Sequence, residues 1–211
     1  MTTRPIMRGY IHLTAALITP FALALLLVVA DSPRDYAGAA VFGASLILLY
    51  TISAFYHLVL LRSRYLSMLR RMDHAMIFLL IGGTYTPFAL KILDAGWGIA
   101  ILSVVWGLAG VGILLKLSVP QAPRWFGVGI YLALGWIGLI PSVQMSKALP
   151  MEATILLVAG GLLYSAGGLM YLFRWPDPFP RVFGFHEVFH SMVVIASGIF
   201  YFVVAVYVLP Y

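Results

Sequence analysis

The stretch SMVVIASGIFYFVVAVYVL, residues 191–209, decides the fold class of this chain. It contains no Asp, Glu, Lys or Arg, and a helix that spans a bilayer needs roughly 20 predominantly apolar residues. The stretch therefore predicts a transmembrane helix. It follows directly on HEVFH, residues 186–190, which has the H-E-x-x-H spacing of zinc metalloproteases.

The composition of the whole chain agrees with a membrane protein. Of its 211 residues 63% are hydrophobic and 9% charged, whereas a soluble domain carries about 25% charged residues. The chain has no cysteine, which excludes disulfides, thiolate zinc sites and covalently attached c-type haem. Histidine and carboxylate side chains remain as the strong metal ligands.

Apolar runs recur along the full length of the chain, separated by short loops. We predict one all-α domain, residues 1–211, built as a seven-helix transmembrane bundle. The predicted spans are 11–30, 37–61, 73–90, 97–115, 125–143, 153–173 and 186–208.

The basic residues are distributed unevenly between the two sides of this predicted bundle. The N-terminal tail and the loops on its side hold ten Lys and Arg residues, and the opposite loops hold three, which predicts a cytoplasmic N-terminus and an outside C-terminus. The net charge of +6 then reflects topology and not a nucleic-acid site, because no basic block is present. The ten residues are Arg4, Arg8, Arg62, Arg64, Arg70, Arg71, Lys116, Arg124, Arg174 and Arg181, and the three are Arg34, Lys91 and Lys147.

Four ionisable side chains from three predicted helices lie at a similar depth below the cytoplasmic face. His57 lies near the cytoplasmic end of span 37–61, and Asp73 opens the next span. His186 and His190 begin the last span on the same side. Ionisable groups in a bilayer are costly and need a partner or a function, so this coincidence predicts a site.

The spacing of these residues suits a metal ion. His186 and His190 are four residues apart, and so are Ser53 and His57, which places each pair on one helix face. Three neutral imidazoles and one water form a common catalytic zinc arrangement. Asp73 would then orient the water, accept its proton, or hydrogen-bond a ligand imidazole.

Simpler explanations exist for each residue taken alone. An interfacial histidine, such as His12 or His74, usually hydrogen-bonds a lipid headgroup or the backbone. Asp73 would stabilise the positive end of a helix dipole as an N-terminal cap. A pair of histidines four residues apart also arises by chance on amphipathic helices. Four such accidents at one depth are the less favoured explanation.

A protease site of the H-E-x-x-H type is incomplete in this chain. Such a site needs a third ligand, which in the common families lies downstream, and no Asp, Glu or His follows His190. Glu187 is also rotated by about 100° from His186 around the helix. A third ligand has to come from upstream, where His57 lies at the right depth.

The candidate site residues lie in three motifs, SAFYH (53–57), RMDHAMIFLLIGGTYTPF (71–88) and HEVFHS (186–191). Together these motifs resemble the bacterial hemolysin III family, the prokaryotic branch of the progestin and adiponectin receptor (PAQR) proteins, in a superfamily with the alkaline ceramidases. The resemblance implies zinc bound by His57, His186 and His190, with Asp73 and Ser53 at the site. It also implies a hydrolase of membrane lipid amides or esters, linked to lipid homeostasis, in the bacterial inner membrane. The long cytosolic N-terminal region of the eukaryotic receptors is missing.

Other functions remain as alternatives. The first is a non-enzymatic sensor of membrane lipids in which zinc is structural. A channel or transporter is less favoured because the strongest polar groups gather on one side of the bilayer. No lysine lies within the last span to form a retinal Schiff base. We expect membrane lipids as partners and no nucleic acid, and a homo-oligomer stays open.

Overall fold

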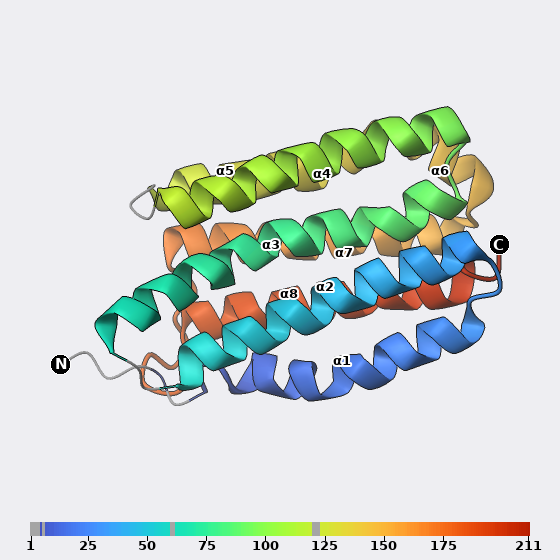
Figure 1. Cartoon of the computed structure of the whole chain (residues 1–211). Coiled ribbons are helices and arrows are strands. Elements are labelled where there is room, and N and C mark those ends of the chain that lie inside the picture. Colours follow the sequence, from blue (N-terminus) through green and yellow to red (C-terminus); the bar gives the residue numbers. More distant parts are fainter. Residues whose placement is uncertain (1–4, 6, 60–61, 120–122) are drawn as a thin grey trace.

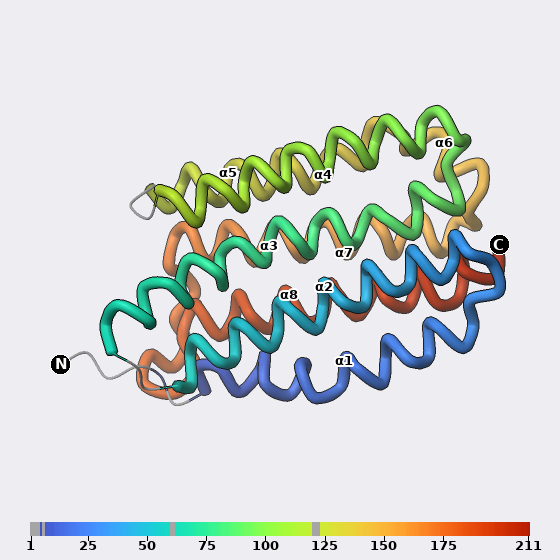
Figure 2. Tube along the Cα trace, viewed as in Figure 1, coloured from blue at the N-terminus to red at the C-terminus, as the bar shows by residue number. Residues whose placement is uncertain are grey.

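The chain folds into a bundle of long, roughly parallel and antiparallel helices (Figures 1 and 2). The structure is a computed structural model, and it describes residues 5, 7–59, 62–119 and 123–211. In chain order the elements are α1 (Tyr10–Val29), α2 (Pro33–Leu58), α3 (Ser63–Lys91), α4 (Ala95–Ser118), α5 (Arg124–Gly135), the 3-10 helix η1 (Trp136–Leu139), α6 (Ser142–Ala148), α7 (Met151–Phe173), α8 (Phe185–Val203) and the π-helical turn η2 (Val204–Val208). The described residues contain one isolated β-bridge, Phe179 with Phe183, and no strand. The predicted all-α class is confirmed.

Neighbouring helices in the chain are also neighbours in space. Helix α2 packs against α1 and α3, α3 packs against α4, and α7 packs against α8, while α8 also contacts α1 (Figure 1). One end of the bundle carries the start of α1, α3 and α8 and the end of α2, and we call it the histidine end. The far end carries the end of α1, the start of α2 and the C-terminal Tyr211.

Five helices, α1, α2, α4, α7 and α8 with η2, are long and apolar enough to cross a membrane. Segments α5, η1 and α6 together make a sixth candidate, bent by 52° at its break. Each of the seven predicted spans corresponds to a helical segment of the bundle. Helix α3 is not one of the candidate spans of the described chain. Its C-terminal half is mostly apolar but includes the segment GGTYTP (82–87), whose residues are less apolar than their neighbours.

Helix α3 begins at Ser63, ten residues before the start of the predicted span at residue 73. The segment 63–72, SRYLSMLRRM, contains Leu, Met and Arg, which favour helix, and no Gly or Pro. The basic residues Arg64, Arg70 and Arg71, which were predicted to lie in a loop, are therefore held on a helix. This fixes their direction relative to the bundle.

The predicted span 125–143 is broken near its middle. The α-helix ends at Gly135, and a single 3-10 turn leads to Pro141, which cannot donate a backbone hydrogen bond. The hydroxyl of Tyr85 on α3 donates to the carbonyl of Gly135 (2.6 Å) and accepts from the amide of Gly138 (2.6 Å). Backbone groups freed inside a bilayer need internal partners, and Tyr85 supplies them.

Candidate metal centre and cavity

The last turns of α2 bring two predicted site residues to the histidine end. Ser53 and His57 lie one helical turn apart on the buried side of α2, with exposed fractions of 2% and 9%. Ser53 Oγ has no hydrogen-bond partner of normal geometry among the described residues. A buried polar atom without a partner costs free energy, so its presence points to a ligand or substrate atom nearby.

The first turn of α8 is held in place by Glu187. One carboxylate oxygen accepts from the backbone amide of Gly184 (2.8 Å), and the other accepts from Arg8 Nε (2.7 Å). The amide of Phe185 donates to Asp177 Oδ1 (3.0 Å). These contacts satisfy amides that the start of a helix leaves free, and they fix the orientation of the histidine-bearing turn.

Three imidazoles meet where α2 and α8 approach each other. The ligand nitrogens of His57, His186 and His190 all lie within 4.8 Å of one another. The two Nε2 atoms of His57 and His186 are 3.2 Å apart. In a tetrahedral site with Zn–N bonds of about 2.0–2.1 Å, two ligand nitrogens are about 3.3 Å apart. His190 also has a buried Nδ1 without a partner in the described chain, so the donor set fits a zinc-sized cation.

Asp73 lies beside this cluster on α3 and does not belong to it. Asp73, Ser53, His186 and His190 all line one cavity. The Ser53 hydroxyl acts electrostatically on the Asp73 carboxyl, although the contact lacks the geometry of a hydrogen bond. The structure thus brings all five predicted site residues together, with three imidazoles as candidate ligands and two oxygen-bearing side chains facing the same space.

A fourth histidine, His12 of α1, was not predicted to belong to this site. Its ring is 3% exposed and stacks on His190, with ring centroids 3.8 Å apart and planes at 7°. The ring of Tyr50 also contacts the ring of His12 edge to face, with ring centroids 5.1 Å apart. The sequence left a headgroup or a backbone contact open for His12; its burial in the protein excludes the headgroup. Its position at the cytoplasmic start of the first predicted span, at the depth of the other histidines, was the available signal.

The two remaining residues of the sequence motifs lie away from the cluster. Glu187 is fully buried and binds Arg8, so it does not act on the metal centre in the manner of a metalloprotease glutamate. His74 lines the cavity next to Asp73, and its backbone carbonyl accepts from the hydroxyl of Tyr131 (2.9 Å).

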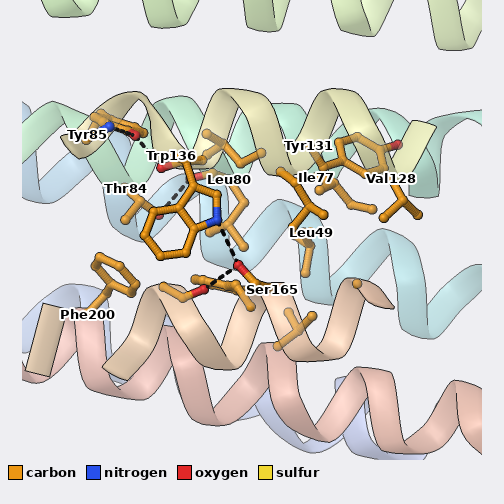
Figure 3. A pocket seen from close by; sticks show the side chains of 18 of the residues that line it. Leu49, Ile77, Leu80, Thr84, Tyr85, Val128, Tyr131, Trp136, Ser165 and Phe200 are labelled. Carbon is orange, nitrogen blue, oxygen red and sulfur yellow. Dashed lines mark hydrogen bonds between the residues drawn. The ribbon is translucent and has the colours of Figure 1, made fainter. Parts of the chain in front are cut away.

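The cavity that the site opens into has a volume of about 400 Å³. Asp73 and Ala89 both line it, so it follows about 24 Å of α3 at the helical rise. Figure 3 shows the apolar part, where Trp136 donates to Ser165 (3.0 Å) and Leu49, Ile77 and Phe200 surround the space. The charged and histidine side chains that line this cavity lie at its histidine end, and the rest of its wall is mostly apolar.

The sequence matches known proteins over nearly its whole length. A model of the family described as Haemolysin-III related matches residues 1–201. The chain is 32% identical over 199 residues to the hemolysin-3 homolog of Bacillus subtilis (strain 168), covering 93% of this chain and 90% of that protein. It is 32% identical over 191 residues to the hemolysin-3 of Bacillus cereus, covering 88% and 84%. The chain belongs to the haemolysin-III-related family.

The predicted family is thereby confirmed, and the wider relationship also holds. The chain is 30% identical over 152 residues to the adiponectin receptor protein of Drosophila melanogaster, covering 62% of this chain and 33% of that protein. The bacterial relatives and the five apolar helices identify a multi-pass integral protein of the bacterial inner membrane. The histidine cluster of this haemolysin-III-related protein could hold a metal ion.

Proposed function

We propose that this protein is a zinc-dependent hydrolase that cleaves an amide or ester bond of a membrane lipid. The observation that carries the proposal is the position of the three imidazoles at the polar end of a long apolar cavity. A purely structural metal site needs no such cavity. His57, His186 and His190 would hold the ion, and Asp73 and Ser53 face the same space.

Zinc bound by three imidazoles would polarise the acyl carbonyl and lower the pKa of a bound water. Asp73 would accept the proton of the attacking water on a carboxylate oxygen and return it to the leaving amine or alcohol. Ser53 Oγ would donate a hydrogen bond to the carbonyl oxygen as negative charge develops there. His12, stacked on His190, holds that ring in position.

The acyl chain would lie along the apolar cavity. Side chains from α2, α3, α5, α7 and α8 line it, so a chain would be surrounded by apolar walls while its carbonyl lies near the histidines. The walls also exclude bulk water from the reacting bond, which strengthens electrostatic interactions there.

We further propose that seven segments cross the membrane and that the histidine end faces the cytoplasm. The support is the excess of Lys and Arg at that end, ten against three. The bent segment α5–η1–α6 and helix α3 would be the two crossings that are less apolar than the five candidate spans.

The variant Asp73→Asn tests the hydrolase directly. The purified protein in phosphatidylcholine nanodiscs is given ceramide or a monoacylglycerol, and release of free fatty acid is followed. Loss of a general base lowers turnover by about 100-fold or more, while zinc content stays at the wild-type level. Asp94→Asn, an exposed carboxylate at the far end, should keep full turnover.

The second candidate is a lipid sensor in which the metal is structural. The hydrogen bond of Glu187 to the Gly184 amide and its ion pair with Arg8 favour this second candidate, because they hold the first turn of α8 in one position. In that case Asp73→Asn leaves activity in cells unchanged, and no fatty acid is released by the wild-type protein.

A further inference from the structure

Four basic side chains surround the opening of the cavity at the histidine end. Arg70 and Arg71 lie one turn before Asp73 on α3, Lys116 lies in the last turn of α4, and Arg124 opens α5. All four line the same cavity as the metal centre. They come from three helices, so the bundle itself gathers them.

Within the described chain no carboxylate forms a close ion pair with any of these four cations, and Asp73 interacts with Arg70 only at longer range. None of them forms an ion pair within 4.0 Å among the described residues, whose ion pairs involve Arg8 and Lys91. Arg70 and Lys116 repel each other electrostatically. Asp73, which interacts with Arg70, is the one acidic side chain among the cavity-lining residues. Like charges placed together without counter-ions are unfavourable, so the cluster is complete only with an added anion.

Positive charge on the cytoplasmic side explains how many basic residues lie there, but not where they point. Arg62 and Arg64 lie at the start of the same helix and do not line the cavity, whereas Arg70, which is also exposed, does line it. Topology requires only charge at this end of the chain. The direction of Arg70 and Arg124 towards the cavity needs a further reason.

Aromatic rings hold two of the cations at the opening. The Arg124 guanidinium lies 4.6 Å from the centre of the Tyr171 ring and donates to the Tyr171 carbonyl (3.1 Å). Lys116 Nζ lies 5.7 Å from the ring of Tyr131. Both tyrosines line the cavity. A cation positioned in advance loses less side-chain freedom on binding. Arg71 instead donates to the Leu117 carbonyl (3.0 Å) and ties α3 to α4.

We propose that Arg70, Lys116 and Arg124 bind the phosphate of an anionic lipid headgroup while the acyl chain of the same lipid lies in the cavity. The inference deepens the proposed function by naming its substrate class as acyl lipids with a negatively charged phosphate headgroup, and to that extent it rests on it. In such a lipid the acyl carbonyl lies between chain and headgroup, and the three imidazoles and the basic cluster both lie at the histidine end of the bundle.

The test measures binding and requires no turnover, so a protein that binds but does not hydrolyse refutes only the proposed function. The full-length protein in phosphatidylcholine nanodiscs is titrated with lysophosphatidylglycerol that carries a brominated stearoyl chain, which quenches nearby tryptophan fluorescence. Trp136 lines the cavity, and Trp136→Phe reports how much of the quenching comes from it. Lysophosphatidylcholine and monoacylglycerol with the same chain, and inorganic phosphate as competitor, complete the set.

We expect lysophosphatidylglycerol, whose headgroup has a net negative charge, to bind about tenfold more tightly than zwitterionic lysophosphatidylcholine or uncharged monoacylglycerol, and the preference to weaken as salt screens the charges. The Arg70→Gln/Arg124→Gln variant should lose most of this preference while it binds monoacylglycerol unchanged, which also shows that it is folded. Arg70→Lys/Arg124→Lys should retain part of it, and Arg62→Gln/Arg64→Gln all of it. Equal binding of the three lipids by the wild type, or an unchanged preference in the Gln variant, overturns the proposal. Inorganic phosphate that binds as tightly as the lipid overturns the assignment to a lipid.

Discussion

Both ends of the bundle carry charged side chains, but the two ends differ in how these side chains are paired within the described chain. At the far end, Asp35 Oδ2 accepts from the Ser32 amide (3.1 Å), the Ser32 hydroxyl (2.7 Å) and Lys91 Nζ (2.9 Å). This ties the start of α2 to the end of α3, although Asp35 Oδ1 has no partner in the described chain. At the histidine end, Ser53 Oγ, His190 Nδ1 and Arg71 Nε have no hydrogen bond of normal geometry within the described chain, and all three residues line the cavity.

The difference in side-chain pairing indicates a different role for each end. A charge that has its partner inside the protein stabilises the fold, whereas a polar group without a partner lowers stability and is retained for another reason. The contacts of Asp35 at the far end therefore hold helices α2 and α3 together. The histidine end carries the three imidazoles that could hold a metal ion, and our proposal adds a lipid at the same end.

The largest effect on stability is expected when the cation that pairs with Asp35 at the far end is removed. Lys91→Met leaves the buried Asp35 carboxylate without its cation and should lower the free energy of unfolding by about 2–3 kcal/mol, allowing for the partial exposure of Lys91. Detergent-induced unfolding of the purified protein measures it. The exposed Lys147→Met at the same end serves as control and should stay within about 0.5 kcal/mol of the wild type.

Zinc content and lipid binding should not change in Lys91→Met. A loss of zinc in this variant would show that the two ends are coupled. The assignment of a stabilising role to the far end and a binding role to the histidine end would then be wrong.

A second prediction concerns the ring stack at the histidine end. His12→Ala removes a buried ring from His190 and should lower the free energy of unfolding by about 1–2 kcal/mol. His12→Phe keeps the stacked ring and should restore both the stability and the zinc affinity. If His12→Phe loses zinc as fully as His57→Ala does, His12 is a ligand and not a positioning residue.

The smallest expected effect on stability is that of Ser53→Ala. Because Ser53 Oγ has no hydrogen bond of normal geometry in the fold, its removal should change the free energy of unfolding by less than about 0.5 kcal/mol, and turnover should fall about tenfold or more. Ser32→Ala, which removes a hydroxyl paired with Asp35, should cost about 1 kcal/mol and leave turnover intact. The reverse order of the two stabilities would contradict the comparison of the two ends.

The sequence predicted the helical bundle well because apolar length alone identifies a membrane helix. It placed the start of α3 too late, since the basic segment before Asp73 continues the helix outside the apolar run. The break after Gly135 depends on Tyr85 of another helix, and no local signal reports such a contact.

The histidine cluster could be predicted because helix ends on one side of a membrane share one depth. His57, His186 and His190 were grouped by that argument, and the structure brings them together. Depth alone does not say which helices are adjacent, so His12 remained outside the prediction. The cavity and the direction of Arg70 and Arg124 also depend on how the helices are rotated against one another.

The most direct test of the account is the metal content of the purified protein. Elemental analysis should find about one zinc per chain in the wild type and in His74→Ala, which alters a cavity-lining histidine outside the cluster, and almost none in His57→Ala. A wild-type protein without bound metal after purification in zinc-containing buffer, or a His57→Ala variant that keeps its zinc, would contradict the account.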